Sequence, residues 1–319
     1  MLGTSPAVRT AALLGVGSIA AVGLLRARGV HVQPVRAGIE GLSRLAPSVQ
    51  PKAQKAFWRA VYGLSTRRSD PADAFMNYGY APLASNGHNG AGPAAAEFGT
   101  ALYDRVAGAA DLRGKEVLEI GCGRGGGTAH VFAAHGAASM VGVDLTPEAI
   151  RRSEADHARP GLRFEVADAE RLPFADASFD AVLNVESCHC YPDVPRFLRE
   201  AHRVLRPGGV LLIADVRHTS LERAIAGGPL QHEDVEDFRR QVAASPFELV
   251  EEEDITPNVT RALELDSPRR RAIVEQRVPR LLQSQALLFA AVEGTALHDA
   301  CRNGDMTYLR MVLRKPEAV

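Results

Sequence analysis

The sequence of 319 residues has no excess of charge of either sign. It contains 37 Lys and Arg against 38 Asp and Glu, and the formal net charge at pH 7 is −1. Proteins that bind nucleic acid usually present a strongly basic surface to the phosphate backbone. This balance removes the electrostatic argument for a nucleic-acid partner, and we expect none.

Cysteine is also scarce. The four cysteines (Cys122, Cys188, Cys190 and Cys301) show no disulfide framework, so a reducing, cytoplasmic compartment is the default. The segment Cys188-His189-Cys190 suggests a metal site, but structural zinc usually takes four ligands with paired C-x₂₋₄-C spacing, and the sequence has no such second pair. We treat the cysteines as small buried hydrophobic residues and predict no metal ion.

Long hydrophobic runs are missing as well. The longest uncharged apolar stretch, residues 10–25, is shorter than the ~20 apolar residues of a spanning helix. It has the length of a signal-peptide core, but Arg26 and Arg28 follow at once and no convincing cleavage site does. Two interpretations stay open: a leader that is packed or partly disordered, and a short anchor that makes peripheral contact with a membrane.

Breaker residues divide the rest of the chain. Residues 1–50 are predicted to form the leader. Residues 52–64 and 94–108 are predicted helices, with the aromatic segment FMNYGY between them, and 51–110 together form an N-terminal helical lid. Residues 111–319 form the main domain.

From Lys115 onward, short apolar strands alternate with helical segments, which is the pattern of a parallel sheet. Residues 206–209 (RPGG) predict a tight turn into the fifth strand, and residues 258–303 predict a helical insertion that covers one end of the sheet. The expected fold class is α/β, with a Rossmann-like doubly wound sheet. The predicted strands are 116–120, 139–143, 162–166, 179–185, 210–216, 247–255 and 306–315, and the predicted helices are 126–135, 147–157 and 194–204.

The strongest local motif is VLEIGCGRGGG at residues 117–127, where an apolar strand runs into glycines and a helix follows. Glycine permits a sharp turn and close approach of a ligand to the backbone. Gly121, Gly123 and Gly126 satisfy G-x-G-x-x-G, which is also the dinucleotide fingerprint. Glu119 argues against a pyrophosphate, because its carboxylate would repel a dianion but suits a ligand with an ammonium and a sulfonium.

Acidic residues end the next two strands. Asp144 can accept hydrogen bonds from both hydroxyls of a ribose, and it can also cap the helix that opens at Pro147. The third strand ends in Asp168-Ala169-Glu170, where an acceptor is placed to bind the exocyclic amine of adenine. These two positions predict a nucleoside site.

Two titratable residues, Glu186 and His189, follow the fourth strand, at the edge where ligands enter an open α/β sheet. Imidazole titrates near neutrality, so His189 is a candidate general base for a phenol or enol. The alternative is a pocket histidine, bonded to the backbone or to Glu186, that orients the substrate without catalysing. Glu186 is predicted to orient His189, to balance a cation or to form a simple salt bridge.

In this order and at these spacings, EVLEIGCGRGGG, GVDLTPEAI, VADAERLPFADASFDAVLNVESCHCYPD and VLRPGGVLLIADVR resemble the successive motifs of class I S-adenosylmethionine-dependent methyltransferases. More narrowly, NVESCHCYPD and FMNYGY are similar to segments of phthiotriolone-type lipid O-methyltransferases, and less closely to those of sterol side-chain methyltransferases. The resemblance is specific over residues 75–217, fainter in the C-terminal third, and leaves residues 1–50 uncovered.

The resemblance implies a seven-stranded sheet with an antiparallel last strand, S-adenosylmethionine as methyl donor and S-adenosylhomocysteine as product. It implies methylation of a lipophilic small molecule, with oxygen as the methylated atom. The alternatives are C-methylation of a sterol- or prenyl-like substrate, an NAD-dependent oxidoreductase and a catalytically silent binding module. The residues expected to line the donor pocket are Glu119, Gly121, Cys122, Gly123, Asp144, Leu145, Asp168, Ala169, Glu170 and Asn184.

The aromatic residues Phe75, Tyr78 and Tyr80 precede this domain. Ring faces attract cations, so these side chains can form a lid over a sulfonium, and we count Tyr80 among the donor-binding residues. Core packing is the competing interpretation, above all for Phe75.

Overall fold

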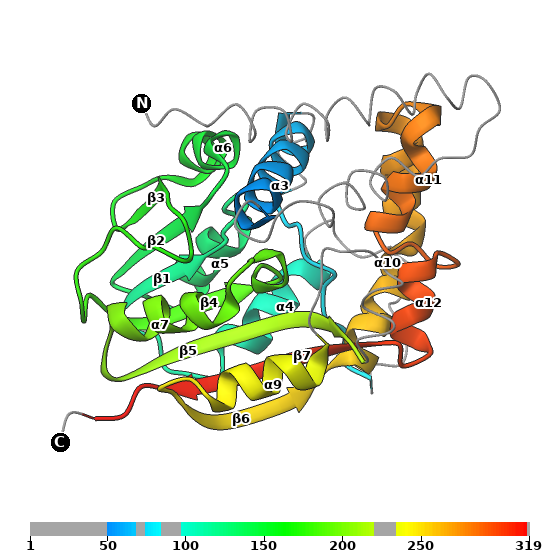
Figure 1. Cartoon of the computed structure of the whole chain (residues 1–319). Helices are drawn as coiled ribbons and strands as arrows, with labels where there is room; N and C mark the ends of the chain where they lie inside the picture. Colours follow the sequence, from blue (N-terminus) through cyan, green and yellow to red (C-terminus); the bar gives the residue numbers. More distant parts are fainter. Residues whose placement is uncertain (1–49, 68–73, 84–96, 220–233, 318–319) are drawn as a thin grey trace.

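The computed structural model describes residues 50–67, 74–83, 97–219 and 234–317 (Figure 1). The predicted leader, with the candidate anchor at residues 10–25, lies outside the described residues. None of the described helices is long and apolar enough to cross a membrane.

A seven-stranded sheet forms the centre of the described chain, with the strand order β3-β2-β1-β4-β5-β7-β6. Only β7 runs antiparallel, and it pairs with β5 on one side and β6 on the other. The predicted fold class is therefore confirmed, including the antiparallel last strand. The strands are β1 (Glu116–Ile120), β2 (Ser139–Asp144), β3 (Leu162–Val166), β4 (Phe179–Val185), β5 (Leu205–His218), β6 (Glu248–Asp254) and β7 (Met306–Arg314).

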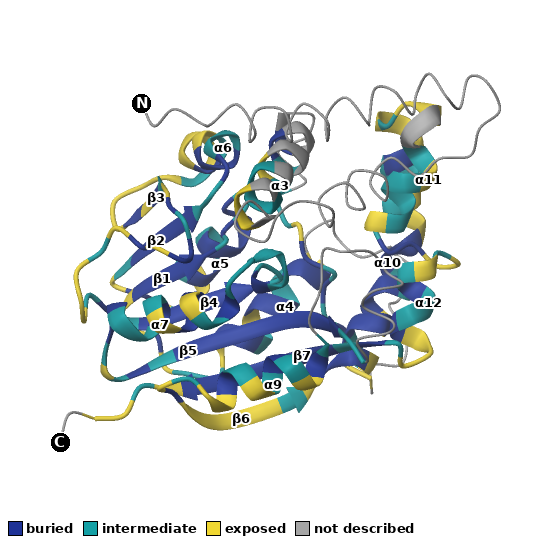
Figure 2. Cartoon of the chain, in the orientation of Figure 1, coloured by how far each residue is buried: buried dark blue, intermediate teal, exposed yellow. Residues whose placement is uncertain are grey.

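The central strands are buried on both faces, which explains their nearly continuous apolar sequences (Figure 2). Successive side chains point to opposite faces, so Val117 joins one core cluster while Leu118 joins the other. Helices α4 (Glu97–Ala107) and α5 (Gly126–Ala134) contribute to the first cluster. Helices α7 (Val194–Val204) and α9 (Val235–Ala243) contribute to the second. The sheet is thus covered by helices on both faces.

The outer strand β6 differs from the others, because nearly all of its residues are exposed. It carries the acidic run EEED, and charge on an edge strand discourages pairing with another chain. Beside β3, at the other end of the sheet, α6 (Pro147–His157) packs against α3 (Gln50–Arg67). The predicted helix at 52–64 is confirmed as part of α3.

Three helices stand at one end of the sheet, over the residues where a helical insertion is predicted: α10 (Thr256–Arg277), α11 (Arg280–Phe289) and α12 (Ala296–Arg302) (Figure 1). The guanidinium of Arg270 on α10 donates to the carbonyl oxygens of Asn77 and Tyr78, and Ala81 N donates to Asn258 O. The segment 74–83 is therefore tied to the insertion, and the two form one cap.

The tight turn predicted at residues 206–209 is wrong, because these residues lie inside β5, which begins at Leu205. Phe179 pairs with Leu205 and Ala181 with Val210, so the register shifts between them. Gly208, with φ of +75°, gives the strand the backbone freedom that such an irregularity needs. Helix α9 was not predicted, although Asp234 and Asp237 form a capping box at its start.

Candidate functional site

The glycine-rich loop connects β1 to α5 at the carboxyl edge of the sheet. The φ angles of Gly121 and Gly123 are +83° and +54°, in the left-handed region that favours glycine. A Cβ on Gly121 would lie 1.9 Å from the Oγ of Ser187. The backbone N–H groups of Gly121 and Cys122 both donate to Val143 O, at 2.7 and 3.0 Å. The loop is therefore held against the end of β2, with a conformation only glycine fits.

Asp144 links this loop to the next helix. Its Oδ2 accepts from Gly123 N at 3.1 Å, and its Oδ1 accepts from Thr146 N at 2.8 Å. Burial raises the pKa of Asp144. Each carboxylate oxygen can accept more than one hydrogen bond, so the group keeps acceptor capacity for a ligand. Leu145, next in the chain, is half-buried beside it.

Glu119 is enclosed rather than open to the loop. Its side chain is fully buried, Oε1 accepts from Tyr103 Oη at 2.7 Å, and Oε2 accepts from Thr128 Oγ1. Burial raises the pKa of Glu119 to about 7, against these two hydrogen bonds, which lower it. Both carboxylate oxygens of Glu119 are thus hydrogen-bonded to side chains of α4 and α5. The sequence did not point to these partners, Tyr103 and Thr128.

The acids after β3 meet a lysine from the N-terminal lid. The Nζ of Lys55, on α3, lies 2.8 and 2.7 Å from the two carboxylate oxygens of Asp168 and 2.6 Å from Oε2 of Glu170. Ala169 between them is buried. Nothing in the sequence around Lys55 points to this contact, because a lysine in a surface helix carries no distinguishing pattern.

Asn184 and Cys122 are buried at the carboxyl edge of the sheet. Asn184 is fully buried, and its Nδ2 donates to Ile120 O at 2.8 Å and to Tyr191 Oη at 3.0 Å. Its Oδ1 accepts from Cys188 N at 3.2 Å, so the amide braces β1 against the short helix η2 (Cys188–Cys190). The Cys122 thiol is buried.

His189 on η2 contacts a carboxylate at the end of β5. Its Nδ1 lies 2.6 Å from Oδ1 of Asp215, and its backbone N–H donates to Oδ2 at 2.7 Å. Burial alone would lower the pKa of His189, but the Asp215 carboxylate outweighs it and the pKa is held well above its ordinary value. Because Asp215 stays ionised, the imidazole Nδ1 carries the hydrogen of this bond.

Asp215 has further buried partners. It accepts from Cys188 Sγ at 2.8 Å, and Arg217 Nη1 lies 3.1 Å from its Oδ2. The Arg217 guanidinium stacks over the Phe238 ring, 4.2 Å from its centroid. Although burial opposes ionisation, the charges of His189 and Arg217 lower the pKa of Asp215. An acid inside the otherwise apolar run of a central strand is the signal by which the sequence could have identified it.

Glu186 has other hydrogen-bond partners than the ring of His189, whose Nδ1 is bonded to Asp215. Its Oε1 accepts from Tyr78 N at 2.6 Å and from Tyr308 Oη at 2.7 Å. Burial raises the pKa of Glu186 to about 7. Its φ of +47° is uncommon for a residue with a side chain, and such strain tends to occur at functional sites. Glu186 thus joins the cap segment and β7 to the site.

The three aromatic lid candidates take different places. Tyr78 reaches the site through its backbone, as above. Tyr80 donates its backbone N–H to Phe98 O and so lies against α4. Phe75 packs edge-to-face on Tyr103, with ring centroids 6.0 Å apart, which supports its core-packing interpretation.

Comparison with known proteins identifies the chemistry of this family. Residues 118–213 match the family described as "Methyltransferase domain". The chain is 34% identical over 270 residues to the phthiotriol/phenolphthiotriol dimycocerosates methyltransferase of Mycobacterium leprae (83% of this chain and 94% of the relative). It is also 34% identical to the fatty-acid O-methyltransferase of Mycolicibacterium smegmatis (77% and 85%).

A solved structure, that of the cyclopropane synthase MmaA2 from Mycobacterium tuberculosis, has the same fold. The TM-score is 0.64 and the sequence identity 18%, over 78% of this chain and 95% of that one.

NMR can follow the titration of the His189 imidazole and so test its pairing with Asp215. In the wild type the imidazolium should persist to a pH well above 6.5, the ordinary pKa of histidine. In Asp215→Asn the raising charge is gone while burial remains, so the pKa of His189 should fall to its ordinary value or below. His157, on α6, serves as an internal reference that should not move. Equal His189 titrations in both proteins would show that the pair does not set its charge.

Proposed function

The chain belongs to the S-adenosylmethionine-dependent methyltransferase family, and from this premise we propose that it methylates a hydroxyl or carboxyl oxygen of a lipid or other lipophilic small molecule. The observation that carries the choice of oxygen is the His189–Asp215 pair at the carboxyl edge of the sheet. The names of two relatives, a phthiotriol methyltransferase and a fatty-acid O-methyltransferase, point to lipid acceptors with oxygen functions.

The residues at the edge of β1, β2 and β3 suit the donor. Gly121 and Gly123 leave the backbone bare, and a Cβ on Gly123 would meet only the flexible Met76 Sδ, at 3.2 Å. Asp144 can accept further hydrogen bonds from the ribose hydroxyls. Asp168 can accept one from the adenine amine while its carboxylate stays bonded to Lys55. Carboxylates at this edge favour a cationic ligand over a pyrophosphate. When bound, the donor supplies an electrophilic methyl group on a sulfonium.

His189 is proposed to take the proton of a hydroxyl acceptor on Nε2, while its Nδ1–H stays bonded to Asp215. This is the arrangement in which a buried carboxylate fixes the tautomer of a general base. Its side chain is 16% exposed, so it lies close to the surface that an acceptor reaches. Because the pKa of His189 is raised, its neutral form, and with it the rate, should increase as pH rises through that value. A carboxyl acceptor is ionised near neutral pH and needs no base.

Glu186 is proposed as a positioning residue. It holds the backbone of Tyr78 and the hydroxyl of Tyr308 on two sides of the site, and so couples the cap to the sheet. On the cap, Leu287 and Leu288 are half-buried and Phe289 is 42% exposed. These side chains give the cap apolar surface for a lipophilic acceptor.

Asp144→Ala tests the donor site. Losing a hydrogen bond to a charged group costs about 1.5–3 kcal/mol, so affinity for S-adenosylhomocysteine measured by calorimetry should fall about tenfold or more. Asp156→Ala, on the exposed side of α6, is the matched control and should bind like the wild type. Unchanged affinity in a folded Asp144→Ala would remove this residue from the site.

His189→Gln tests the base, since an amide can orient a substrate but cannot accept its proton. Donor affinity should stay close to that of the wild type, and single-turnover methyl transfer should slow by about 10²–10⁴-fold. The increase of the rate with pH that we expect in the wild type should be absent from this variant. His157→Gln is the control on an unrelated histidine. Near wild-type turnover in His189→Gln would reject the base and leave proximity of the reactants as the main source of catalysis.

A further inference from the structure

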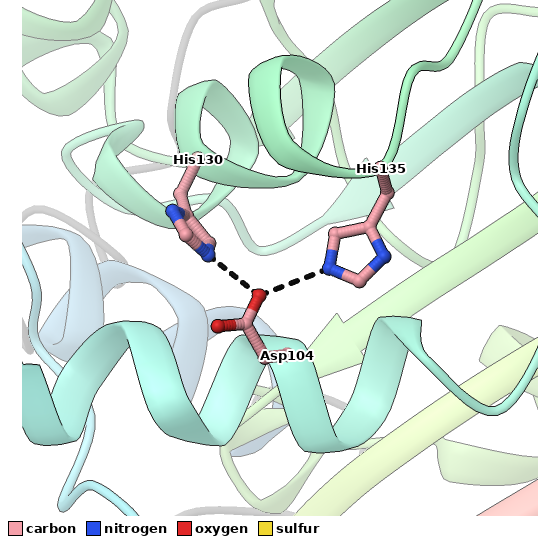
Figure 3. A group of neighbouring side chains, drawn as sticks. All are labelled: Asp104, His130 and His135. Carbon is pink, nitrogen blue, oxygen red and sulfur yellow. Dashed lines mark hydrogen bonds and ion pairs between the residues drawn. The ribbon is translucent and has the colours of Figure 1, made fainter.

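Away from the carboxyl edge, three side chains with metal-binding atoms converge between α4 and α5 (Figure 3). Asp104 comes from α4, His130 lies on α5, and His135 is the residue that ends α5. The two imidazoles point at the same atom: the Nε2 atoms of His130 and His135 lie 2.7 and 3.0 Å from Oδ1 of Asp104. The sequence does not reveal this group, because Asp104 is 26 and 31 residues away from the histidines.

We propose that Asp104, His130 and His135 bind a divalent transition metal ion, Zn²⁺, with a fourth position left to water. Two imidazole nitrogens and one carboxylate oxygen form an established Zn²⁺ ligand set, and three protein ligands plus water satisfy its tetrahedral preference. Mg²⁺ and Ca²⁺ prefer oxygen ligands, so the histidines disfavour them. Fe²⁺ accepts the same ligand types but binds a given site more weakly than Zn²⁺.

The geometry needs only a small adjustment. Ligand bonds of about 2.0–2.2 Å in a tetrahedron separate the ligand atoms by about 3.3–3.6 Å, compared with the 2.7 and 3.0 Å between Oδ1 of Asp104 and the two histidine nitrogens. All three ligand atoms lie within 4.8 Å of one another. The side chain of Asp104 is 51% exposed whereas those of His130 and His135 are 24% and 19% exposed, so the cluster has a solvent side for the water ligand.

The electrostatic setting also favours a cation. His135 is the C-cap of α5, and Asp104 lies in the last turn of α4, so the C-terminal ends of two helix dipoles contribute partial negative charge nearby. An ion here would tie α4 to α5. Those helices supply Tyr103, adjacent to Asp104, and Thr128, which both donate to the buried Glu119 beneath the glycine loop. The ion would thus stabilise the support of the loop.

Calorimetry of the full chain, stripped of metal with a chelator and titrated with Zn²⁺, tests the site. We expect one Zn²⁺ per chain and a higher melting temperature on binding. His130→Gln and His135→Gln should each weaken binding at least tenfold, since loss even of an outer-shell partner costs a metal site about 10–100-fold. His157→Gln is the control and should bind like the wild type. Zn²⁺ affinity unaffected by both ligand variants, or no binding by the wild type, would overturn the proposal.

Titration of the wild type with Co²⁺ tests the site without any variant, so the result does not depend on whether a variant folds. A site of nitrogen and oxygen ligands should give ligand-field absorption without a thiolate-to-cobalt charge-transfer band. Such a band would show that a cysteine thiolate binds the ion, and would contradict the assignment to Asp104 and the two histidines.

Discussion

The buried carboxylate of Asp215 is the group on which the organisation of the site depends. It holds the ring and backbone of His189, accepts from the Cys188 thiol and balances the buried charge of Arg217. Removing one partner of a buried ion pair typically costs about 3–5 kcal/mol, because the other charge is left uncompensated. The turn after β4, and the histidine that it carries, are therefore held by a residue of the neighbouring strand β5, together with Asn184.

Two other buried acids connect the sheet to the elements that cover it. Glu119 receives hydrogen bonds from α4 and α5, and Glu186 receives them from the cap segment and β7. Burial raises the pKa of each to about 7, whereas the pKa of Asp215 is lowered by its cationic neighbours. Residues of the same chemistry thus differ in charge near neutral pH. Protonation of the two glutamic acids removes the cost of burying their charge.

The sequence predicted the parts of the site that follow from strand order. In a parallel sheet the carboxyl ends of β1, β2 and β4 meet at one edge, so Gly121, Asp144 and His189 come together once the strands are identified. It did not predict partners that depend on packing between distant segments. Lys55 and Asp168 are 113 residues apart, and Tyr308 and Glu186 are 122 apart. Glu119 was expected to line the donor pocket, but the hydroxyls that enclose it come from helices whose contacts no local pattern encodes.

The His189–Asp215 pair is proposed to serve methylation of oxygen. The most direct measurement is ¹³C NMR of the product formed from S-adenosylmethionine labelled at its methyl carbon, with a long-chain fatty acid and a long-chain diol as acceptors. The account predicts the label in a methyl ester or methyl ether, bonded to oxygen. Label bonded to carbon would contradict it, and would assign the pair a role other than removing a proton from a hydroxyl group.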